Sequence, residues 1–361
     1  MYEREKKYLF IYAVPLGAIV SFMAPGWWSF LLPVVAFILI PIMELFTEQS
    51  TVNLDEHQEK EALEDKFYDR LLYSMVPLQF FIVFFGLYIM KTQEWTTIEL
   101  IGKVASMGTC CGIIGINLGH ELGHRTELKE QLMAKALLLS SMYMHFFIEH
   151  NRGHHLRAAT AEDPATARRG EILYFFWIRS IVFSFISAWE LEAERFKRDG
   201  KSIYTLKNEM IQLILIQSAF VGLVYFVLGF QSMLLFLAAA LLGILLLETV
   251  NYIEHYGLLR KKKENGKYEK VLPIHSWNSD HSLGRQFLFE LSRHSDHHYL
   301  ASRKFQILRH FEASPQMPLG YPGMIMLSTI PPLWFFVMHR HIDKYEKMLG
   351  AKMNGEEMSF A

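Results

Sequence analysis

Cysteine is almost absent from this sequence: of 361 residues only Cys110 and Cys111 are cysteines, side by side in an apolar segment. Two adjacent cysteines fit neither a disulfide framework nor a Cys-x-x-Cys metal knuckle, and there is no cysteine set for an iron–sulfur cluster. No Gly-rich turn follows a predicted strand, so no dinucleotide-binding site is expected. A large excess of one charge is also missing, because the formal net charge is −1, and nucleic acid is therefore not indicated as a partner.

Hydrophobic residues are abundant instead. They make up 51% of the chain, with 28 Phe, 16 Tyr and 7 Trp, which favours an integral membrane protein. Apolar windows long enough to cross about 30 Å of hydrocarbon predict an all-α membrane bundle with six transmembrane helices. These helices are expected near residues 8–24, 28–46, 72–90, 99–119, 209–228 and 233–252.

The positive charges predict the side of the membrane on which the polar parts lie. Of 36 Lys and Arg, only Lys91 and Lys103 lie at or near the short connections between the spans. The positive-inside rule therefore places both termini and the long polar stretches 47–71, 120–208 and 253–361 in the cytoplasm. We expect a single membrane-embedded domain over residues 1–361, with a histidine-rich cytoplasmic helical cap from 120–208 and 253–345. The first apolar segment has no small-residue cleavage site, so we interpret it as a retained anchor.

Three further apolar runs, 132–148, 172–189 and 321–338, are not predicted to be spans. The first carries Lys135 and His145, the second has Arg179 in its middle, and Pro331-Pro332 interrupts the third. Such runs suit helices in the membrane interface or buried helices of the cap, and the sequence does not separate these two possibilities.

Nine histidines gather in four groups at or beyond the predicted cytoplasmic ends of the spans. In three of the groups the histidines lie three or four residues apart, and side chains with this spacing share one face of a helix. Adjacent imidazoles such as His154 and His155 diverge, which favours two metal ions over one. Imidazole nitrogen suits iron, copper, zinc or nickel, so the ligand type alone does not name the metal. The candidate ligands are His120, His124, His150, His154, His155, His255, His294, His297 and His298.

A carboxylate adjoins a histidine in each group: Glu121, Glu149, Glu254 and Asp296. Such carboxylates can accept the outer ring N–H and so orient a ligand, although capping a helix or pairing with Arg152 or Arg293 is the alternative. Six other histidines lack the cluster spacing and are not expected to be ligands: His145, His275, His281, His310, His339 and His341. Of these, His275 and His281 are expected to lie closest to the site. His57 lies alone in a charged segment and is expected to have no role.

Two other kinds of protein compete for these motifs. His120-Glu121-Leu122-Gly123-His124 also fits the zinc metalloprotease pattern His-Glu-x-x-His, but a protease site would leave the other seven histidines without a function. A metal transporter would need ionisable side chains in the middle of its spans, and these spans have almost none.

Taken together, the motifs resemble those of the integral-membrane alkane 1-monooxygenases, which are relatives of the histidine-rich fatty-acid desaturases. The resemblance is carried by His-Glu-Leu-Gly-His at 120–124, Glu-His-Asn-Arg-Gly-His-His at 149–155 with Thr-Ala-Glu-Asp-Pro-Ala at 160–165, Asn-Tyr-Ile-Glu-His-Tyr-Gly-Leu at 251–258, His-Ser-Trp-Asn-Ser at 275–279, Arg-His-Ser-Asp-His-His at 293–298 and Gly-Tyr-Pro-Gly-Met at 320–324. It covers roughly residues 70–340. One departure is Asp280 before His281, where Asn was expected.

The resemblance implies an O2-dependent enzyme with a non-haem centre of two iron ions held by the nine histidines. It implies hydroxylation of alkanes to 1-alkanols in the bacterial inner membrane, with electrons from rubredoxin and its flavin reductase. Relatives that act on fatty acyl chains or methyl-aromatic compounds remain the alternative. Two sets of residues carry further hypotheses. Bulky candidates for limiting the accepted chain length are Trp28, Phe37, Phe80 and Phe84, although residues of this kind also face lipid or fill the core. A candidate basic docking face for the electron donor comprises Arg152, Arg157, Arg168, Arg169, Arg303, Lys304 and Arg309, with a solvated face or contacts to lipid phosphates as the alternatives.

Overall fold

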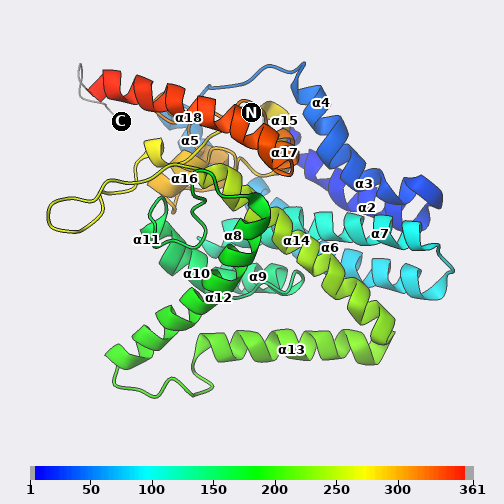
Figure 1. Ribbon diagram of the computed structural model, residues 1–361. Coiled ribbons are helices and arrows are strands. Elements are labelled where there is room, and N and C mark those ends of the chain that lie inside the picture. Colours follow the sequence, from blue (N-terminus) through cyan, green and yellow to red (C-terminus); the bar gives the residue numbers. More distant parts are fainter. Residues whose placement is uncertain (1–4, 354–361) are drawn as a thin grey trace. The chain divides into compact units, whose positions relative to one another are not determined.

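The computed structural model describes residues 5–353, with side chains for residues 5–350. Within this range the chain is helical and forms no β-sheet, only isolated β-bridges (Figure 1). The predicted all-α class is therefore confirmed. Residues 1–4 and 354–361, which the predicted single domain includes, lie outside the described residues.

Five of the described helical segments are long and apolar enough to cross a membrane. They are Gly26–Glu44, Lys66–Thr92, Thr97–Gly123, Glu209–Leu228 and Phe230–His255. Each overlaps a predicted span, and the chain is a membrane protein. The remaining predicted span, 8–24, coincides with the shorter apolar helical segment Lys7–Met23, so a sixth crossing stays a prediction.

The described chain divides into two compact units, each built from three stretches of sequence. Unit 1 comprises Met1–Leu39, Glu64–Gly153 and Ser184–Leu247. Its elements include η1 (Lys7–Tyr12), α2 (Ala13–Met23), η2 (Gly26–Phe30), α3 (Leu31–Val34), η3 (Val35–Leu39), α6 (Lys66–Thr92), α7 (Thr97–Cys110), η4 (Cys111–Ile116), α8 (Asn117–Gly123), α9 (Leu128–Leu139), α10 (Phe146–Glu149) and α13 (Glu209–Leu228).

Unit 2 comprises Ile40–Leu63, His154–Phe183 and Glu248–Ala361. Its elements include α4 (Ile40–Glu44), α5 (Glu56–Glu64), α11 (His155–Arg157), η6 (Pro273–His275), α15 (Ser282–Phe287), α16 (His294–Tyr299), η7 (Phe305–Ile307), α17 (Tyr321–Ser328) and α18 (Pro331–Met353). Three elements run through a unit boundary well inside their length: η5 (His150–His154), α12 (Leu173–Arg198) and α14 (Phe230–His255). The last residue of α5, Glu64, also lies beyond a boundary and belongs to unit 1.

Polar side chains fix where the spanning helices of unit 1 begin. The Asp65 carboxylate accepts from Phe67 N at 2.8 Å at the start of α6, and the Asn208 amide oxygen accepts from Met210 N at 2.9 Å at the start of α13. At the start of α7, Thr96 and Glu99 form a capping box. Each cap satisfies an N–H group that has no partner inside its helix.

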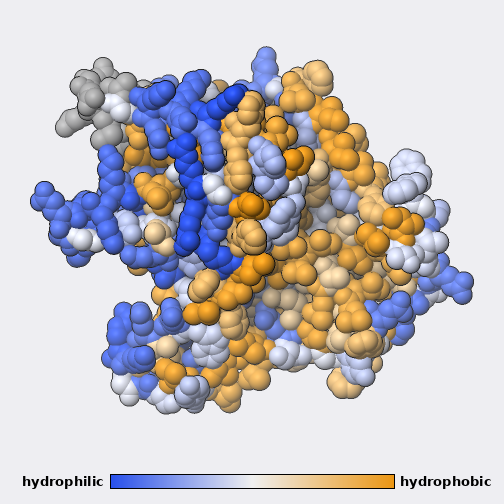
Figure 2. Space-filling view, viewed as in Figure 1, coloured by the Kyte–Doolittle hydropathy of each residue, from blue (hydrophilic) through white to orange (hydrophobic). Residues whose placement is uncertain are grey.

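Glycine allows two helical stretches of unit 1 to pack closely. A Cβ at Gly243 in α14 would lie 2.6 Å from Cys111 Cβ in η4, and a Cβ at Gly108 in α7 would lie 2.6 Å from Leu242 Cβ. Small residues permit this close backbone approach between membrane helices. Elsewhere in unit 1, orange surface covers α2 and α3 in Figure 2, as expected of helices that face lipid.

The three apolar runs that were not predicted to be spans are not candidate spans in the structure. Run 132–148 is divided between α9 and α10, and run 321–338 between α17 and α18, which begins at Pro331. Run 172–189 forms part of α12, where Arg179 is held by the Glu171 carboxylate, at 2.6 and 2.8 Å, and by the carbonyl oxygens of Pro164 and Thr166. These partners explain how a guanidinium is accommodated in an apolar run.

Candidate metal centre

Unit 1 brings three of the candidate ligands together. His120 lies in α8, His124 caps the C-terminus of the same helix, and His150 begins η5. The rings of His120 and His124 are 4.8 Å apart between centroids, and those of His120 and His150 4.4 Å. His124 Nε2 lies 3.1 Å from His150 Nε2. Each residue offers one ligand nitrogen, and these nitrogens all lie within 4.8 Å of one another.

Unit 2 contains a buried group of four histidines. His154 comes from η5, His255 from the last residue of α14, and His294 and His298 from α16. Their ligand nitrogens all lie within 4.8 Å of one another, and all four side chains are buried. Two pairs of Nε2 atoms face each other at 3.2 Å, His154 with His298 and His255 with His294. The group therefore draws on three distant parts of the sequence.

The last two candidate ligands also meet in unit 2. His155 Nε2 lies 3.1 Å from His297 Nε2, and the two rings are 4.8 Å apart between centroids. His154 and His155, which are adjacent in sequence, have different partners: the first faces His298 and the second faces His297. This divergence is what the sequence led us to expect of neighbouring imidazoles.

The segment His150–His154 is a π-helix rather than an ordinary α-turn. A π-helix is a rare local widening of an α-helix that occurs frequently at functional sites. It sets where the rings of this motif point, and the sequence spacing gave no sign of it. A second π-helix, Cys111–Ile116, precedes α8 and so leads into the His120 motif.

The donor set of the four-histidine group fits a metal cation. His154 Nδ1 lies 2.9 Å from Asp163 Oδ2, and because a carboxylate only accepts, the ring proton lies on Nδ1 and the lone pair on Nε2. Burial holds the pKa of His298 well below its ordinary range, so this ring is neutral and can also offer a lone pair. Nitrogen lone pairs facing each other at close range repel unless a proton or cation lies between them.

Asp163 is a site residue that the sequence reasoning did not identify. Burial alone would raise the pKa of this carboxyl, but His154 and Thr166 lower it to about 2. Its Oδ2 accepts from the Thr166 hydroxyl at 2.6 Å and its Oδ1 from Ala165 N at 3.2 Å. Asp163 lies in the motif at 160–165, which contributed to the resemblance without a role being assigned to any of its residues.

Glu254 is the predicted carboxylate that lies closest to a candidate ligand nitrogen in unit 2. Its Oε2 is 3.2 Å from His294 Nε2, and its Oε1 accepts from the Tyr321 hydroxyl at 2.8 Å. Glu254 precedes His255 at the end of α14 and is buried. It therefore faces the nitrogen that His294 directs into the group, rather than the outer nitrogen of that ring.

The other three predicted carboxylates have polar partners of their own. Glu121 accepts from Arg125 at 2.7 Å, and Glu149 accepts from Ser187 at 3.2 Å. Asp296 accepts from the Arg303 guanidinium and, at 2.7 Å, from Arg309 N. These contacts resemble the helix-capping and ion-pairing alternatives that the sequence left open, and a role in orienting histidines stays a prediction for all three.

The remaining histidines lie outside both metal-ligand groups of the described chain. His57 is exposed and lies 3.5 Å from Glu61. His275 Nε2 lies 3.1 Å from Glu269, and His281 Nδ1 lies 3.0 Å from the Ser279 hydroxyl. Asp280, the departure from the expected Asn, accepts from His310 Nδ1 at 2.7 Å.

Sequence comparison matches these features to known proteins. The fatty acid desaturase family profile matches residues 98–328. Alkane 1-monooxygenase 2 of Pseudomonas aeruginosa is 40% identical over 323 residues, covering 89% of this chain and 86% of that protein. The chain belongs to the alkane 1-monooxygenase family.

Two further relatives show the breadth of the similarity. The alkane 1-monooxygenase of Acinetobacter baylyi is 38% identical over 315 residues, which cover 87% of this chain and 77% of the relative. The hydroxylase component of the xylene/toluene monooxygenase of Pseudomonas putida is 30% identical over 272 residues, or 74% and 72% of the two chains. The protein is thus a membrane-bound monooxygenase with histidine clusters suited to metal ions, and the resemblance drawn from the sequence motifs is confirmed.

Proposed function

We propose that this enzyme hydroxylates the terminal methyl group of alkanes to give 1-alkanols at a centre of two iron ions. In the overall reaction one C–H bond breaks and one C–O bond forms. One oxygen atom of O2 enters the alcohol and the other leaves as water, which consumes two electrons and two protons. The electrons come from rubredoxin, which a flavin reductase reduces. The site lies on the cytoplasmic side of the bacterial inner membrane.

The observation that carries this proposal is the identity of 38–40% to alkane 1-monooxygenases over most of both chains. Buried and half-buried histidines with converging nitrogens support it, because imidazole nitrogens suit a transition metal. Nine imidazoles exceed what one ion coordinates. Four of them form one group in unit 2, which leaves five for a second ion.

The iron pair, when bound, supplies the activation of dioxygen that attack on an unactivated C–H bond demands. The side chains described above would bind the metal ions, orient the ligand rings and keep water away from them. Asp163 keeps the ring proton of His154 on Nδ1, which leaves Nε2 as a donor. Tyr321 donates to one oxygen of Glu254 and so fixes the other oxygen beside His294. Burial of all four histidines in this group excludes water from their nitrogens.

The substrate reaches the site from the bilayer in this proposal. An alkane gains about 0.8 kcal/mol for each methylene kept out of water, so access from lipid is favoured over access from the cytosol. Phe80 and Phe84, two candidates for limiting chain length, each lie 5.9 Å from the ring of Phe220 between α6 and α13. They therefore pack inside unit 1, whereas Trp28 is largely exposed.

Hydroxylation of methyl-aromatic compounds is the second candidate. It is favoured by the similarity to the hydroxylase component of xylene/toluene monooxygenase, but at 30% identity that similarity is weaker than the similarity to the alkane enzymes. A desaturase or hydroxylase of fatty acyl chains is favoured by the match to the fatty acid desaturase profile. The products formed from an alkane, a xylene and a fatty acyl substrate distinguish these possibilities.

The test combines metal analysis with product analysis on the purified full chain. We expect about two iron atoms per chain and 1-alkanol as the product when reduced rubredoxin is supplied. His154→Ala and His297→Ala should abolish turnover, and the matched control His57→Ala, at an exposed position, should not affect it. One zinc and no iron in the active protein, or equal effects of all three substitutions, would contradict the proposal.

A further inference from the structure

A lysine-rich hairpin extends from unit 2 at residues 259–270. Its two arms meet in a β-bridge between Lys262 and Tyr268, and Lys263 N donates to Lys267 O at 2.8 Å across the turn. The segment has six Lys or Arg against two Glu, a net charge of +4. It is the long yellow-green loop of Figure 1 and a hydrophilic lobe in Figure 2. Positive charge is therefore concentrated on one projecting element.

The base of the hairpin is fixed to the segment that follows His155. Arg260 is buried there. Its backbone N donates to Ala159 O at 2.7 Å, and its guanidinium donates to Leu156 O at 2.8 Å and to Glu269 O at 3.0 Å. The lysines are thereby held at a defined position relative to this histidine motif.

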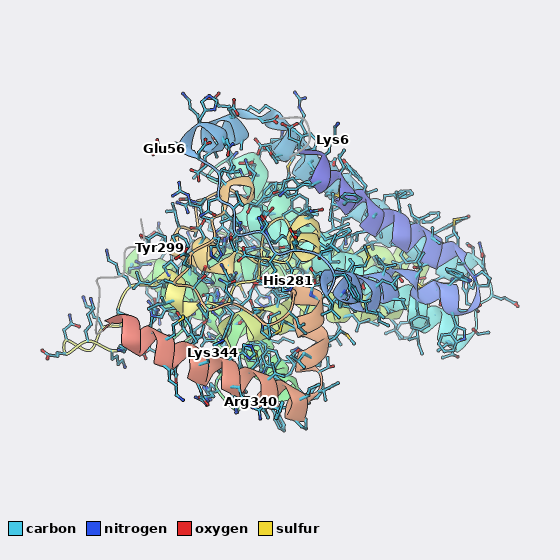
Figure 3. All side chains as sticks on the ribbon, turned by 90° about the horizontal axis from the view of Figure 1, so that it is seen from above. Lys6, Glu56, His281, Tyr299, Arg340 and Lys344 are labelled. Carbon is cyan, nitrogen blue, oxygen red and sulfur yellow. The ribbon has the colours of Figure 1, made fainter. Side chains whose placement is uncertain are left out.

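Four large apolar side chains are exposed at the same part of unit 2. Leu156 is 73% exposed, Leu259 60%, Leu300 44% and Tyr299 40%; we call these four residues the apolar patch. Figure 2 shows a small orange area over α16 beside the hydrophilic hairpin, and Figure 3 labels Tyr299 at the end of α16. None of the four residues belongs to a candidate span.

Residues of the apolar patch directly follow two of the candidate ligands in sequence. Leu156 follows His155 in sequence, and Tyr299 follows His298. The rings of His155 and His298 are 4.6 Å apart between centroids, which brings the two parts of the patch together. A molecule bound to the patch would therefore contact residues that directly follow His155 and His298 in the sequence. Electron tunnelling weakens steeply with distance, so this is a favourable place for electrons to arrive.

We propose that the apolar patch and the hairpin lysines form the docking surface for an acidic one-electron carrier protein. The inference rests on the proposed function, since it names where the donor binds. Each encounter would transfer one electron from the metal of the carrier, which is thereby oxidised, to the proposed iron centre, and two encounters would supply the two electrons of one turnover. A small apolar centre with a charged rim suits a weak redox encounter, which typically buries under about 1,200 Å². Positive charge selects an acidic partner and speeds association.

The arginines in the basic face expected from the sequence carry less available charge. Arg152 is paired with Glu192 at 2.5 Å and Glu209 at 3.0 Å, and Arg309 with Glu59 at 2.7 Å. Arg169 lies 2.6 Å from Asp343. Their positive charge is largely neutralised within their own units. The exposed hairpin lysines, such as Lys263 and Lys267, therefore dominate the attraction for a donor.

The experiment uses the full chain, in nanodiscs of neutral lipid and in parallel in nanodiscs that contain anionic lipid, with rubredoxin as the probe. One variant combines Lys263→Glu with Lys267→Glu, and a second carries Leu300→Ser. The matched controls are Lys344→Glu with Lys347→Glu on α18, where Figure 3 shows Lys344 at a different position from Tyr299, and the exposed Val52→Ser. Binding of oxidised rubredoxin is measured directly, on iron-free as well as iron-loaded protein, and KM for reduced rubredoxin is measured in turnover.

We expect the lysine variant to bind rubredoxin about tenfold more weakly and to lose most of the salt dependence of binding. Leu300→Ser should weaken binding without changing the salt dependence, and both control variants should match the wild type. Reduction of the iron by dithionite should be unchanged in every variant. Unaltered rubredoxin binding would overturn the proposal, and so would variants that respond only to anionic lipid in the nanodisc. Loss of alkane hydroxylation in the wild type, with rubredoxin binding intact, would instead overturn the proposed function.

Discussion

Asp163 holds the ring proton of His154 on Nδ1, which in the proposed metal site leaves Nε2 of that ring as the ligand atom. Both of its oxygens accept hydrogen bonds, Oδ2 from His154 and Thr166 and Oδ1 from Ala165 N. An asparagine has only one carbonyl oxygen, so its NH2 group must face one of these donors. Where the NH2 group faces His154 and Thr166, the ring proton of His154 is no longer held on Nδ1 and Nε2 becomes a poorer ligand; where it faces Ala165 N, that backbone donor loses its acceptor.

Asp163→Asn is therefore expected to lower the affinity for iron by about 10- to 100-fold. The measurement is an iron titration of the metal-free protein, followed by turnover at saturating iron. Glu162→Gln is the matched control, because this neighbouring carboxylate is exposed and lies 3.8 Å from Lys262. Equal affinities in Asp163→Asn and the wild type would show that the hydrogen bond does not orient the ring.

His145 makes the stability of unit 1 depend on pH. Burial lowers its pKa from 6.5 to about 4, and its ring packs against Tyr143 and Phe185 with centroid distances of 4.5 and 5.2 Å. Because the folded-state pKa is depressed, the unfolded chain takes up the proton first as the pH falls. Stability is complete above about pH 6.5 and is lost between there and about pH 4.

We expect lowering the pH from 7 to 5 to cost the wild type on the order of 2 kcal/mol more than it costs His145→Leu. The thermal midpoints of both proteins at the two pH values give this difference. The contributions of the other histidines are the same in both proteins and therefore cancel in the comparison. His57→Leu, at an exposed position, should follow the wild type. Parallel pH dependence in His145→Leu and the wild type would mean that His145 titrates normally in the folded protein.

At the residue scale, the sequence predicted the candidate ligands better than their partners. Histidines three or four residues apart must share a helix face, and the structure groups all nine by short contacts within the two units. Asp163 could not be found in this way, because its position depends on the loop after α11, where Ala159 has a φ of +57°. Backbone conformations of that kind do not follow from spacing.

At the scale of elements, the end of α14 shows how a turn supports the site. Gly257 lies two residues after His255 with a φ of +74°, and its N donates to Ala167 O at 3.0 Å. A glycine in the left-handed region just after the last helical turn is a common way to end a helix. A Cβ at this position would also lie 2.6 Å from Ile342 Cδ1 in α18.

Gly257→Ala is expected to cost about 1–2 kcal/mol from backbone strain alone, and more from the contact with Ile342. Thermal unfolding and iron content should both decrease. Gly200→Ala is the matched control, since Gly200 has a φ of +64° with open space around it and reports the strain alone. Adding Ile342→Val, which removes the contacting methyl group, should restore part of the loss. If Gly257→Ala and Gly200→Ala lowered the free energy of unfolding equally, backbone strain alone would account for the loss of stability, and the contact with Ile342 would contribute nothing.

The positions of the long helices could largely be predicted from the sequence, but the sequence did not show which segments form π-helices instead of α-helices. Apolar windows located all five candidate spans, because a spanning helix needs about 20 apolar residues, and the last one ends at His255 as expected. The π-helices at Cys111–Ile116 and His150–His154 were not foreseen. They depend on tertiary packing, which can insert an extra residue into a helical turn at small energetic cost.

At the scale of the whole molecule, composition was enough to predict a helical membrane protein, but not its division into units. The boundary between the units falls after Gly153, inside a single histidine motif, and again within α12 and α14. Hydropathy separates lipid-facing from water-facing segments, whereas the units are defined by which segments pack together. The expectation of a single domain therefore stays a prediction.

The four-histidine group has a consequence for how the protein is made. His154 and His298 are 144 positions apart, and α13 and α14, two of the candidate spans, lie between them in the sequence. Synthesis proceeds from the N-terminus, so the last ligand leaves the ribosome long after the first. Insertion of that helical pair into the bilayer must then precede metal loading. A metal ion bound there would join the two ends of a very long loop, much as a disulfide formed late in folding does. Metal binding would then be the last step of folding, after the membrane has fixed the arrangement of the spanning helices.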